Sequence, residues 1–403
     1  MLEGVTLEQA VECICQRVHK YEKIRKIAVS EAGGCCLAED IYAGMDNPPF
    51  SRAPVDGYAV RSADLKGASA RVPVKLKVKG CIYAGCDGQA SAIGPGEAMQ
   101  IMTGAPFPKG SDTAVKQEDT DYGEDVVCIY KQQQPFDNYC FQGEDYKKGT
   151  LLLQKGSRLT FAEQGILAGL GYTEVPVYCK PVIRIFTPGD ELCSPGQQLL
   201  PGKIYNSNGM MVSARVRELG FVPAEVSHVP DREEELAGIL CKACEDADII
   251  LTTGGVSVGK KDILHGALEI LGAEKIFWKV LLQPGTPTIF SVYKNTWILS
   301  LSGNPFGAMA NLELLLRPML EKMTGDARYS MDTREGVFKG IFPKKSKRRR
   351  FVRAIYRNGE VTLPQGIFSS GAMRTLSGCN CLLEIPPGSK GLQEGDQVKV
   401  WML

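Results

Sequence analysis

The sequence has few histidines and almost no excess of charge. Only three histidines occur in 403 residues, His19, His228 and His265, which makes a histidine-rich metal centre improbable on composition alone. Lys and Arg number 47 against 46 Asp and Glu, so the formal net charge is +1. A dedicated nucleic-acid-binding protein usually carries a strong basic excess. We therefore expect neither a histidine-ligated metal nor nucleic acid as a partner.

Long apolar runs and targeting signals are also missing. No run approaches the ~18 apolar residues that a membrane helix needs, and the N-terminus lacks the basic and apolar regions of a signal peptide. The 14 cysteines follow no regular spacing. Cys241 and Cys244 form a CxxC that zinc or redox chemistry could use, but without a second CxxC, helix cysteines are the better interpretation. We predict free thiols, no membrane span and a cytoplasmic protein.

What is present is an alternation of strand and helix patterns from residue 181 onward. Strands are predicted at 182–186, 224–229, 248–252, 275–282 and 297–301, with helices at 210–219, 233–247, 264–271 and 306–323. This alternation is typical of an α/β layer with a largely parallel sheet. The first 27 residues are predicted to be helical, with Thr6 as the expected N-cap. Residues 72–129 and the chain after Gly325 are β-rich, the latter typical of a small barrel or sandwich. The fold class expected is α/β plus β, in several domains.

Acidic residues and glycines follow the predicted parallel strands, where ligands bind in open α/β sheets. Asp190 and Glu191 follow the first strand, Asp231 the second, and Asp262 closes the Gly-rich loop after the third. A second Gly-rich loop begins at Ser302. Such loops can offer backbone N–H groups to an anion, although each could also be a simple tight turn. Asp231 could equally cap the helix that follows it.

Carboxylates beside an anion cradle need a cation. Two unit charges about 4 Å apart repel by about 4 kcal/mol at an effective dielectric near 20. A hard cation with oxygen ligands, most plausibly Mg²⁺, would reverse the sign of that interaction. The residues themselves therefore predict a magnesium-dependent site for an anionic ligand at one edge of the sheet. By contrast, an Asp-Gly turn at Asp56 and a Thr-Gly turn at Thr103 show nothing by themselves beyond turn formation.

A set of motifs spans nearly the whole chain. They are Ser51-Arg-Ala-Pro-Val-Asp-Gly-Tyr-Ala59, Ile101-Met-Thr-Gly-Ala-Pro106, Gln117-Glu-Asp-Thr120, Gly143-Glu-Asp145, Gly189-Asp-Glu-Leu192, Tyr205-Asn-Ser-Asn208, Thr253-Gly-Gly-Val-Ser-Val-Gly259 and Gly303-Asn-Pro305. Together, and in this order, they resemble the molybdopterin molybdenumtransferase family of the MoeA type, to which the catalytic region of gephyrin also belongs.

The resemblance implies an enzyme of molybdenum cofactor biosynthesis that inserts molybdate or tungstate into adenylylated molybdopterin and releases AMP. It also implies a Mg²⁺-dependent homodimer, with possible handover of the product to molybdoenzymes or their chaperones. The active cleft would lie between the α/β domain of one subunit and the Asp-Gly-Tyr-Ala domain of the other. The implied domains are a linker or dimerisation domain (1–45 with 140–178), a β-rich domain (46–139), an α/β molybdopterin-binding domain (179–326) and a C-terminal β-barrel (327–403).

The resemblance also implies roles for individual residues. Matched to catalytic positions are Asp56, Thr103, Glu191, Asp231, Asp262 and Lys279, the last near the molybdate site. Matched to pterin-binding or oxyanion-binding positions are Thr253, Gly254, Gly255, Ser257, Gly259, Gly303, Asn304, Pro305 and Ser370. The implied metal ligands are Glu191, Asp231 and Asp145.

Several positions depart from the family pattern. The usual Lys-Pro-Gly-Lys-Pro is here Gln283-Pro-Gly-Thr-Pro287, so two expected cations are neutral; Ser302 replaces a proline and Pro188 a threonine. We interpret the chain as a divergent paralogue, for which a lysine restored at 283 would tighten oxyanion binding. A non-catalytic pterin-binding scaffold is the alternative. The basic run 344–350 is interpreted as a solvated hairpin tip rather than a nucleic-acid patch.

Overall fold

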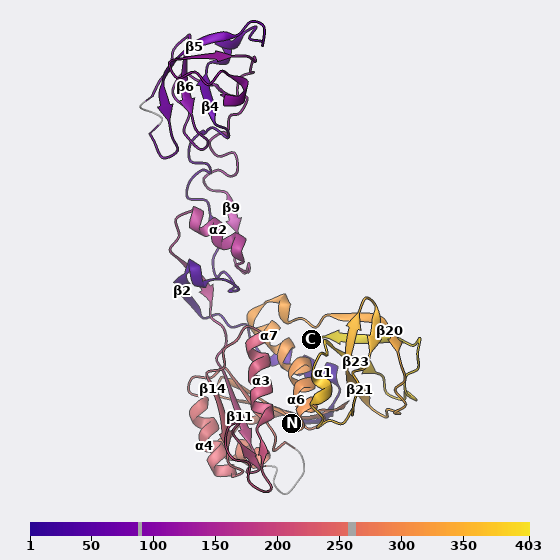
Figure 1. The fold of residues 1–403 in the computed structure, drawn as a ribbon. Coiled ribbons are helices and arrows are strands. Elements are labelled where there is room, and N and C mark those ends of the chain that lie inside the picture. The colour runs from indigo at the N-terminus through magenta and orange to yellow at the C-terminus, as the bar shows by residue number, and fades with distance from the viewer. Residues whose placement is uncertain (88–90, 257–262) are drawn as a thin grey trace. The chain divides into compact units, whose positions relative to one another are not determined.

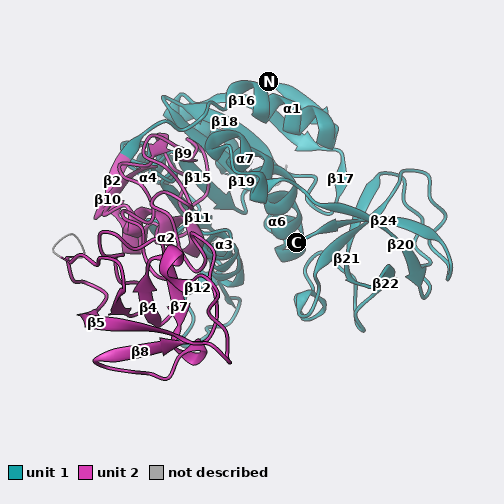
Figure 2. Cartoon of the chain, turned by 90° about the horizontal axis from the view of Figure 1, so that it is seen from above, with its two compact units in different colours: residues 1–24, 178–403 teal, residues 25–177 magenta. Residues whose placement is uncertain are grey.

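The protein, described here as a computed structural model, folds into two compact units. The structure describes residues 1–87, 91–256 and 263–403. One unit comprises residues 1–24 and 178–403 and the other residues 25–177 (Figure 2). The sequence analysis divides the chain into four domains, more than these two units, and that division stays a prediction.

The larger unit is built on a sheet whose described strands follow the order β1-β16-β18-β19-β15-β11-β14. All neighbours are parallel except at β18, which runs antiparallel to both β16 and β19. The strands are β1 (Leu2–Val5), β11 (Ile183–Pro188), β14 (Glu225–Val229), β15 (Ile249–Thr253), β16 (Glu274–Val280), β18 (Ile289–Tyr293) and β19 (Thr296–Leu301). The predicted α/β layer with a largely parallel sheet is confirmed.

Helices cover both faces of this sheet. Successive side chains of a strand point to opposite faces, so Ile185 packs into one buried cluster and Phe186 into the other. The first face is covered by α1 (Leu7–Arg17), α3 (Ser207–Glu218), α6 (Pro305–Asn311) and α7 (Arg317–Thr324). The second face is covered by α4 (Glu233–Ala243) and α5 (Leu264–Leu271). Figure 1 shows α3 and α4 on opposite sides of β11 and β14.

The N-terminus follows its prediction in part. Residues 2–5 form β1, which pairs with β16, and the helix covers Leu7–Arg17 instead of continuing to residue 27. The expected N-cap, Thr6, is confirmed as part of a capping box, in which the Thr6 hydroxyl accepts from the Gln9 N–H and the Gln9 side chain accepts from the Thr6 N–H. Because α1 buries Leu7, Ala10 and Ile14 against the sheet, residues 1–24 form part of the larger unit.

Two features of the large sheet and its helices were not expected. Strand β18 has no counterpart among the predicted strands; it lies between β16 and β19 and buries Ile289 and Phe290. The predicted helix over 306–323 is divided into α6, a π-helical turn at Leu312–Leu316 and α7, and it ends at Gly325 with a left-handed φ of 70°. The helix predicted over 233–247 ends earlier, at Ala243.

The C-terminal part of the larger unit is a closed barrel, as predicted. Strand β21 pairs with both β22 and β23, and the order β21-β22-β20-β24-β23 closes the ring within the described residues. The short strand β17 (Leu282–Gln283) joins β21 from outside. The barrel strands are β20 (Thr333–Lys339), β21 (Arg349–Arg357), β22 (Glu360–Thr362), β23 (Cys381–Ile385) and β24 (Gln397–Met402).

The smaller unit is β-rich, as predicted for residues 72–129. Its largest described sheet has the order β7-β4-β6-β5-β8, formed by β4 (Gly57–Val60), β5 (Val74–Ile82), β6 (Glu97–Ile101), β7 (Thr113–Lys116) and β8 (Val126–Ile129). The remainder holds α2 (Phe161–Gly169) and the short strand pairs β3 (Ile41–Tyr42) with β9 (Leu151–Leu153) and β2 (Ile24–Ala28) with β10 (Glu174–Tyr178).

Candidate functional site

The loops that carry the predicted acids and glycines meet at one edge of the large sheet. Strands β11, β14, β15 and β19 are parallel neighbours, so their carboxyl ends lie together. These ends are followed by Gly189, Asp231, Gly254 and Ser302. Strand β16 runs in the same direction, so the connection that contains β17 leaves from this edge as well.

An acidic, glycine-lined cavity of about 420 Å³ lies at this edge. Its lining joins residues from all four loops: Pro188, Gly189, Glu191, Asp231, Gly254, Gly255, Val256, Pro287, Ser302, Gly303 and Asn304. Six residues of the predicted set are therefore brought together: Glu191, Asp231, Gly254, Gly255, Gly303 and Asn304. We call this the acidic cavity.

Asp231 is held in place by the neighbouring loop. Its Oδ2 accepts from the Asp190 N–H at 3.0 Å, and its own N–H donates to Asp190 Oδ1 at 3.2 Å. Asp231 does not cap the helix, because the N-cap of α4 is Arg232 and makes no side-chain capping bond. Of the two roles that the sequence left open for Asp231, the geometry favours the one in the cavity.

Two glycines permit a close approach of the loops. A Cβ added to Gly303 would lie 3.2 Å from the Gly254 Cα, and Gly254 itself has a left-handed φ of 99°. The Gly254 N–H donates to the Leu301 carbonyl at 3.2 Å. Side chains at these positions would push the two loops apart, so glycine is required by packing and conformation here.

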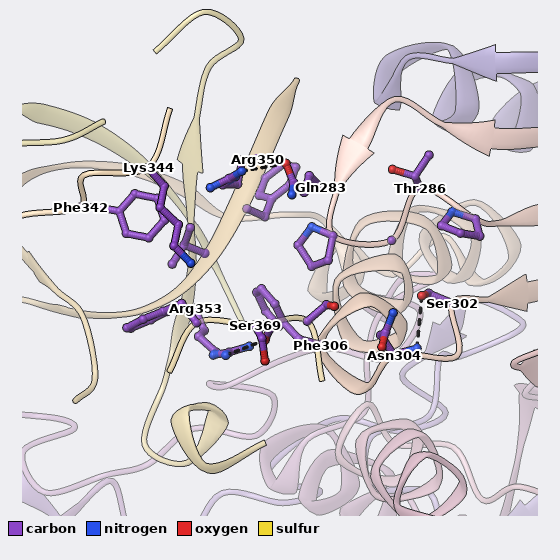
Figure 3. Close-up of a pocket in the computed structure, with 17 residues that line it drawn as sticks. Gln283, Thr286, Ser302, Asn304, Phe306, Phe342, Lys344, Arg350, Arg353 and Ser369 are labelled. Carbon is purple, nitrogen blue, oxygen red and sulfur yellow. Dashed lines mark hydrogen bonds between the residues drawn. The ribbon is translucent and has the colours of Figure 1, made fainter. Parts of the chain in front are cut away.

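A second cavity of about 300 Å³ lies between this edge and the barrel (Figure 3). Its lining is Gln283, Pro284, Gly285, Thr286, Pro287, Ser302, Asn304, Phe306, Phe342, Lys344, Arg350, Phe351, Val352, Arg353, Phe368, Ser369 and Ser370. Three of these described lining residues are cations and none is an aspartate or glutamate. We call this the cationic cavity.

Arg353 is fully buried beside this cavity. Its Nη2 donates to the carbonyls of Ile367 and Ser369, each at 3.0 Å, and its guanidinium lies 4.5 Å from the centre of the Phe306 ring. Its Nε and Nη1 are buried without a partner in the structure. Burial lowers the pKa of this guanidinium below its usual value. Because buried donors are almost always satisfied, these two nitrogens without a partner point to a ligand.

The two cavities adjoin each other. Pro287, Ser302 and Asn304 line both of them. The Ser302 hydroxyl accepts from the Asn304 N–H at 3.3 Å, which fixes the shared wall. A ligand with two anionic groups could therefore reach both the acidic cavity and the cationic one.

Four residues of the predicted set have less direct positions. The Lys279 ammonium pairs with Glu3 at 2.8 Å and lies over the Trp278 ring, and Lys279 lines neither cavity. Thr253 is buried in β15 with its hydroxyl unpartnered, and Pro305 opens α6. Ser370 lines the cationic cavity, and its carbonyl accepts from the Phe306 N–H at 3.0 Å. Ser257, Gly259 and Asp262 lie outside the described residues.

The remaining predicted residues belong to the smaller unit. Asp56 Oδ1 accepts from both the N–H of Thr103, at 2.6 Å, and its hydroxyl, at 2.7 Å. Asp145 Oδ2 accepts from the Asn47 amide at 2.8 Å. The turns at Asp56 and Thr103 thus form a single hydrogen-bonded pair, which a sequence separation of 47 residues could not reveal.

We predict that the Thr103→Val substitution raises the pKa of Asp56. The backbone N–H and then the hydroxyl of Thr103 hold this pKa below its usual value. A depressed folded-state pKa stabilises the fold above the unfolded-state pKa, and this contribution is lost as pH falls through the folded-state pKa. Removing the Thr103 hydroxyl takes away one of the two hydrogen bonds that lower the Asp56 pKa and leaves the bond from the backbone N–H. An NMR titration of the Asp56 carboxyl carbon measures it, with Asp121 as an internal reference whose pKa should not move. An unchanged Asp56 titration would contradict the prediction.

A magnesium site fits only the acidic cavity. Within residues 1–87, 91–256 and 263–403, no three Asp, Glu, Cys or His side chains gather as a metal-binding group. Glu191 and Asp231 nevertheless line the same cavity. Mg²⁺ is usually bound by one or two carboxylates together with water and substrate phosphates. Two carboxylates beside a glycine cradle therefore suit a magnesium ion that arrives with a phosphorylated ligand.

Sequence reasoning missed the cations of the second cavity. The run 344–350 was interpreted as a solvated hairpin tip, but Lys344 and Arg350 line the cationic cavity, and Arg349 pairs with Glu8 and Glu384. One signal in the sequence could have found them. The lysines of the usual family pattern are absent at 283 and 286, while three consecutive arginines occur at 348–350.

The fold and the two cavities define an α/β domain joined to a barrel, with an acidic and a cationic cavity side by side at the carboxyl edge of the sheet. Comparison with known families specifies it further. The MoeA N-terminal region (domains I and II) matches residues 5–171, a probable molybdopterin-binding domain matches residues 184–322, and the MoeA C-terminal region (domain IV) matches residues 336–403. The chain belongs to the molybdopterin molybdenumtransferase (MoeA) family, whose members are transferases of molybdenum cofactor biosynthesis.

Individual relatives agree over nearly the full length. The molybdopterin molybdenumtransferase of Bacillus subtilis (strain 168) is 34% identical, covering 99% of this chain and 94% of the relative. That of Staphylococcus epidermidis is 33% identical, covering 98% and 95%. The crystal structure of the molybdopterin biosynthesis protein MoeA from Pyrococcus horikoshii has a TM-score of 0.84 at 32% identity, covering 99% of both chains. The predicted family and multidomain fold are confirmed. Among the described residues, no helix is long and apolar enough to cross a membrane.

Proposed function

We propose that this protein inserts molybdate, or tungstate, into adenylylated molybdopterin and releases AMP in a Mg²⁺-dependent reaction. One observation carries the proposal: an acidic, glycine-lined cavity adjoins a cationic cavity and shares three lining residues with it. The substrates match this division, because one carries phosphates that arrive with a divalent cation and the other is a bare oxyanion.

The acidic cavity would hold the phosphorylated substrate. Backbone N–H groups of the loops around Gly255 and Gly303 would cradle an anion, since the Gly254 N–H already donates to the Leu301 carbonyl, and Glu191 and Asp231 would hold Mg²⁺. When bound, the ion neutralises phosphate charge and polarises the phosphoanhydride. The protein's own contribution is positioning, which phosphoryl chemistry requires more than a side-chain nucleophile.

The cationic cavity would hold the oxyanion. Arg353 offers two buried nitrogens, Nε and Nη1, without protein partners, and arginine stays charged in proteins. Lys344 and Arg350 add positive charge on the same lining, and Ser370 lies beside them. The shared residues Ser302 and Asn304 would place the oxyanion next to the pterin substrate.

An anaerobic assay tests the proposal. The purified protein is mixed with adenylylated molybdopterin, Mg²⁺ and molybdate, and AMP release is followed by chromatography. We expect AMP release that requires both Mg²⁺ and the oxyanion. Parallel reactions with tungstate compare the rates of AMP release supported by the two oxyanions. Tight binding of the pterin without AMP release would favour the second candidate, a non-catalytic scaffold, which the neutral residues Gln283 and Thr286 make a real alternative.

Further features are proposed from the family resemblance. They are a homodimer with a cleft completed by the second subunit, roles for Asp56, Thr103, Asp145, Asp262 and Lys279 in that cleft, the four-domain division, and handover of the product to molybdoenzymes or their chaperones. A cytoplasmic location is proposed as well and is supported by the 14 cysteines, which follow no regular spacing of a disulfide framework. Sedimentation velocity tests the homodimer.

A further inference from the structure

Arg350 occupies a position in the cationic cavity that the sequence pattern assigns to a different residue. Strand β17 pairs with β21 in parallel, and Gln283 is the direct cross-strand partner of Arg350. The Arg350 Nη2 donates to Gln283 Oε1 at 2.8 Å (Figure 3). The barrel therefore supplies the positive charge through Arg350, beside the position where a lysine at 283 would have supplied it from the loop.

The Arg350 guanidinium is fixed but not neutralised. Gln283 binds one side of it, and the Phe342 ring lies 5.9 Å from its central carbon. Its Nε is buried without a partner, and burial lowers its pKa below the usual value. Among the described residues, no carboxylate forms an ion pair with Arg350, Lys344 or Arg353. The neighbouring Arg349, by contrast, is paired with two carboxylates.

Burying a positive charge that is hydrogen-bonded only to a neutral amide costs free energy unless an anion also binds it. A glutamate at 283 would have neutralised Arg350, and a lysine would have repelled it. Glutamine is the side chain of this length that orients the guanidinium and leaves its charge available. Bidentate N–H groups also suit a tetrahedral oxyanion better than the single ammonium of lysine does.

We propose that Arg350 is an oxyanion-binding residue that sets the affinity for molybdate, and that Gln283 is its positioning residue. The pair replaces the lysine of the usual family pattern with an arginine contributed by the barrel. The inference rests on the proposed function for the identity of the oxyanion. It also reverses the expectation from sequence alone that Gln283→Lys tightens oxyanion binding, because the new ammonium would lie against Arg350.

The test measures the dissociation constant for sodium molybdate by calorimetry at constant ionic strength, with sodium tungstate in parallel and no pterin present. We expect Arg350→Ala to weaken binding at least tenfold, about 1.4 kcal/mol. Lys345→Ala is the matched control, because Lys345 is an exposed cation of the same run that does not line the cavity. It should bind as the wild-type protein does.

Gln283→Glu separates a binding role from a structural one. The new carboxylate keeps the contact with Arg350 and strengthens it, but it neutralises the guanidinium, so the pair keeps its structure and loses its net positive charge. We expect binding to weaken at least tenfold while the thermal midpoint is kept. Gln283→Lys should also weaken binding, whereas the double variant Gln283→Lys with Arg350→Ala should recover affinity relative to Arg350→Ala alone.

Three outcomes would overturn the inference. The first is wild-type affinity in Arg350→Ala, and the second is tighter molybdate binding in the single variant Gln283→Lys, with Arg350 still present. The third is no molybdate binding by the wild-type protein. The proposed function fails in a different way, when molybdate binds with the expected dependence on Arg350 but AMP is not released.

Discussion

Glu191→Gln and Asp231→Asn are each expected to lower the rate of AMP release at least a hundredfold, which corresponds to about 2.7 kcal/mol in the activation barrier. The two carboxylates are the described acidic side chains on the lining of the acidic cavity. Removing either charge takes away half of the side-chain charge available to a magnesium ion there. The phosphates of the substrate would then remain poorly neutralised.

These amide substitutions separate charge from shape. Asn at 231 can still accept the hydrogen bond from the Asp190 N–H that fixes the loop, and Glu191 is exposed. The fold should therefore be kept, with an unchanged thermal midpoint. Single-turnover AMP release measured over a range of Mg²⁺ concentrations should show a raised magnesium requirement in both variants. Glu234→Gln, an exposed residue in the first turn of α4, makes the same charge change outside the cavity and should have no effect. Substantial turnover in both variants at ordinary Mg²⁺ concentrations would contradict the assignment.

The edge of the sheet could be predicted because strand direction and loop composition are both local properties. Once β11, β14, β15 and β19 are recognised as parallel, the loops after them must meet. Glu191, Asp231 and Gly254 follow directly from that rule. The order of the strands was not needed, since any parallel arrangement of these four brings their carboxyl ends to one edge.

The cationic cavity could not be predicted in the same way. Arg350 reaches Gln283 across 67 residues of sequence, through the pairing of β17 with β21. No local pattern fixes such a pairing, which depends on how the barrel docks on the sheet. The position of Lys279 could not be predicted either, because its ammonium pairs with Glu3 of β1, a strand that the sequence pattern does not indicate.

The Asn311→Ala substitution is expected to damage both cavities and the stability of the protein together. Asn311 is fully buried in α6; its amide donates to the Gly285 carbonyl at 3.0 Å, and its Oδ1 accepts from the Ser302 N–H at 3.4 Å. Gly285 lines the cationic cavity, and Ser302 lines both. The substitution leaves the buried Ser302 N–H without a partner, at a cost of about 1–3 kcal/mol, whereas the Gly285 carbonyl keeps its bond from the Thr288 hydroxyl.

The free energy of unfolding should fall by about 1–3 kcal/mol on this basis, and the loosened loops should raise the KM for molybdate at least tenfold even where the protein remains folded. Urea unfolding and steady-state AMP release measure the two effects. Thr296→Val is the matched control, because it removes a buried hydrogen bond to the Ala247 carbonyl at the amino end of β19, at the opposite edge of the sheet. That variant should lose stability while its KM stays unchanged. If both variants lowered stability and left the KM unchanged, Asn311 would be a packing residue like any other. It would then not be a common support for the acidic and the cationic cavity.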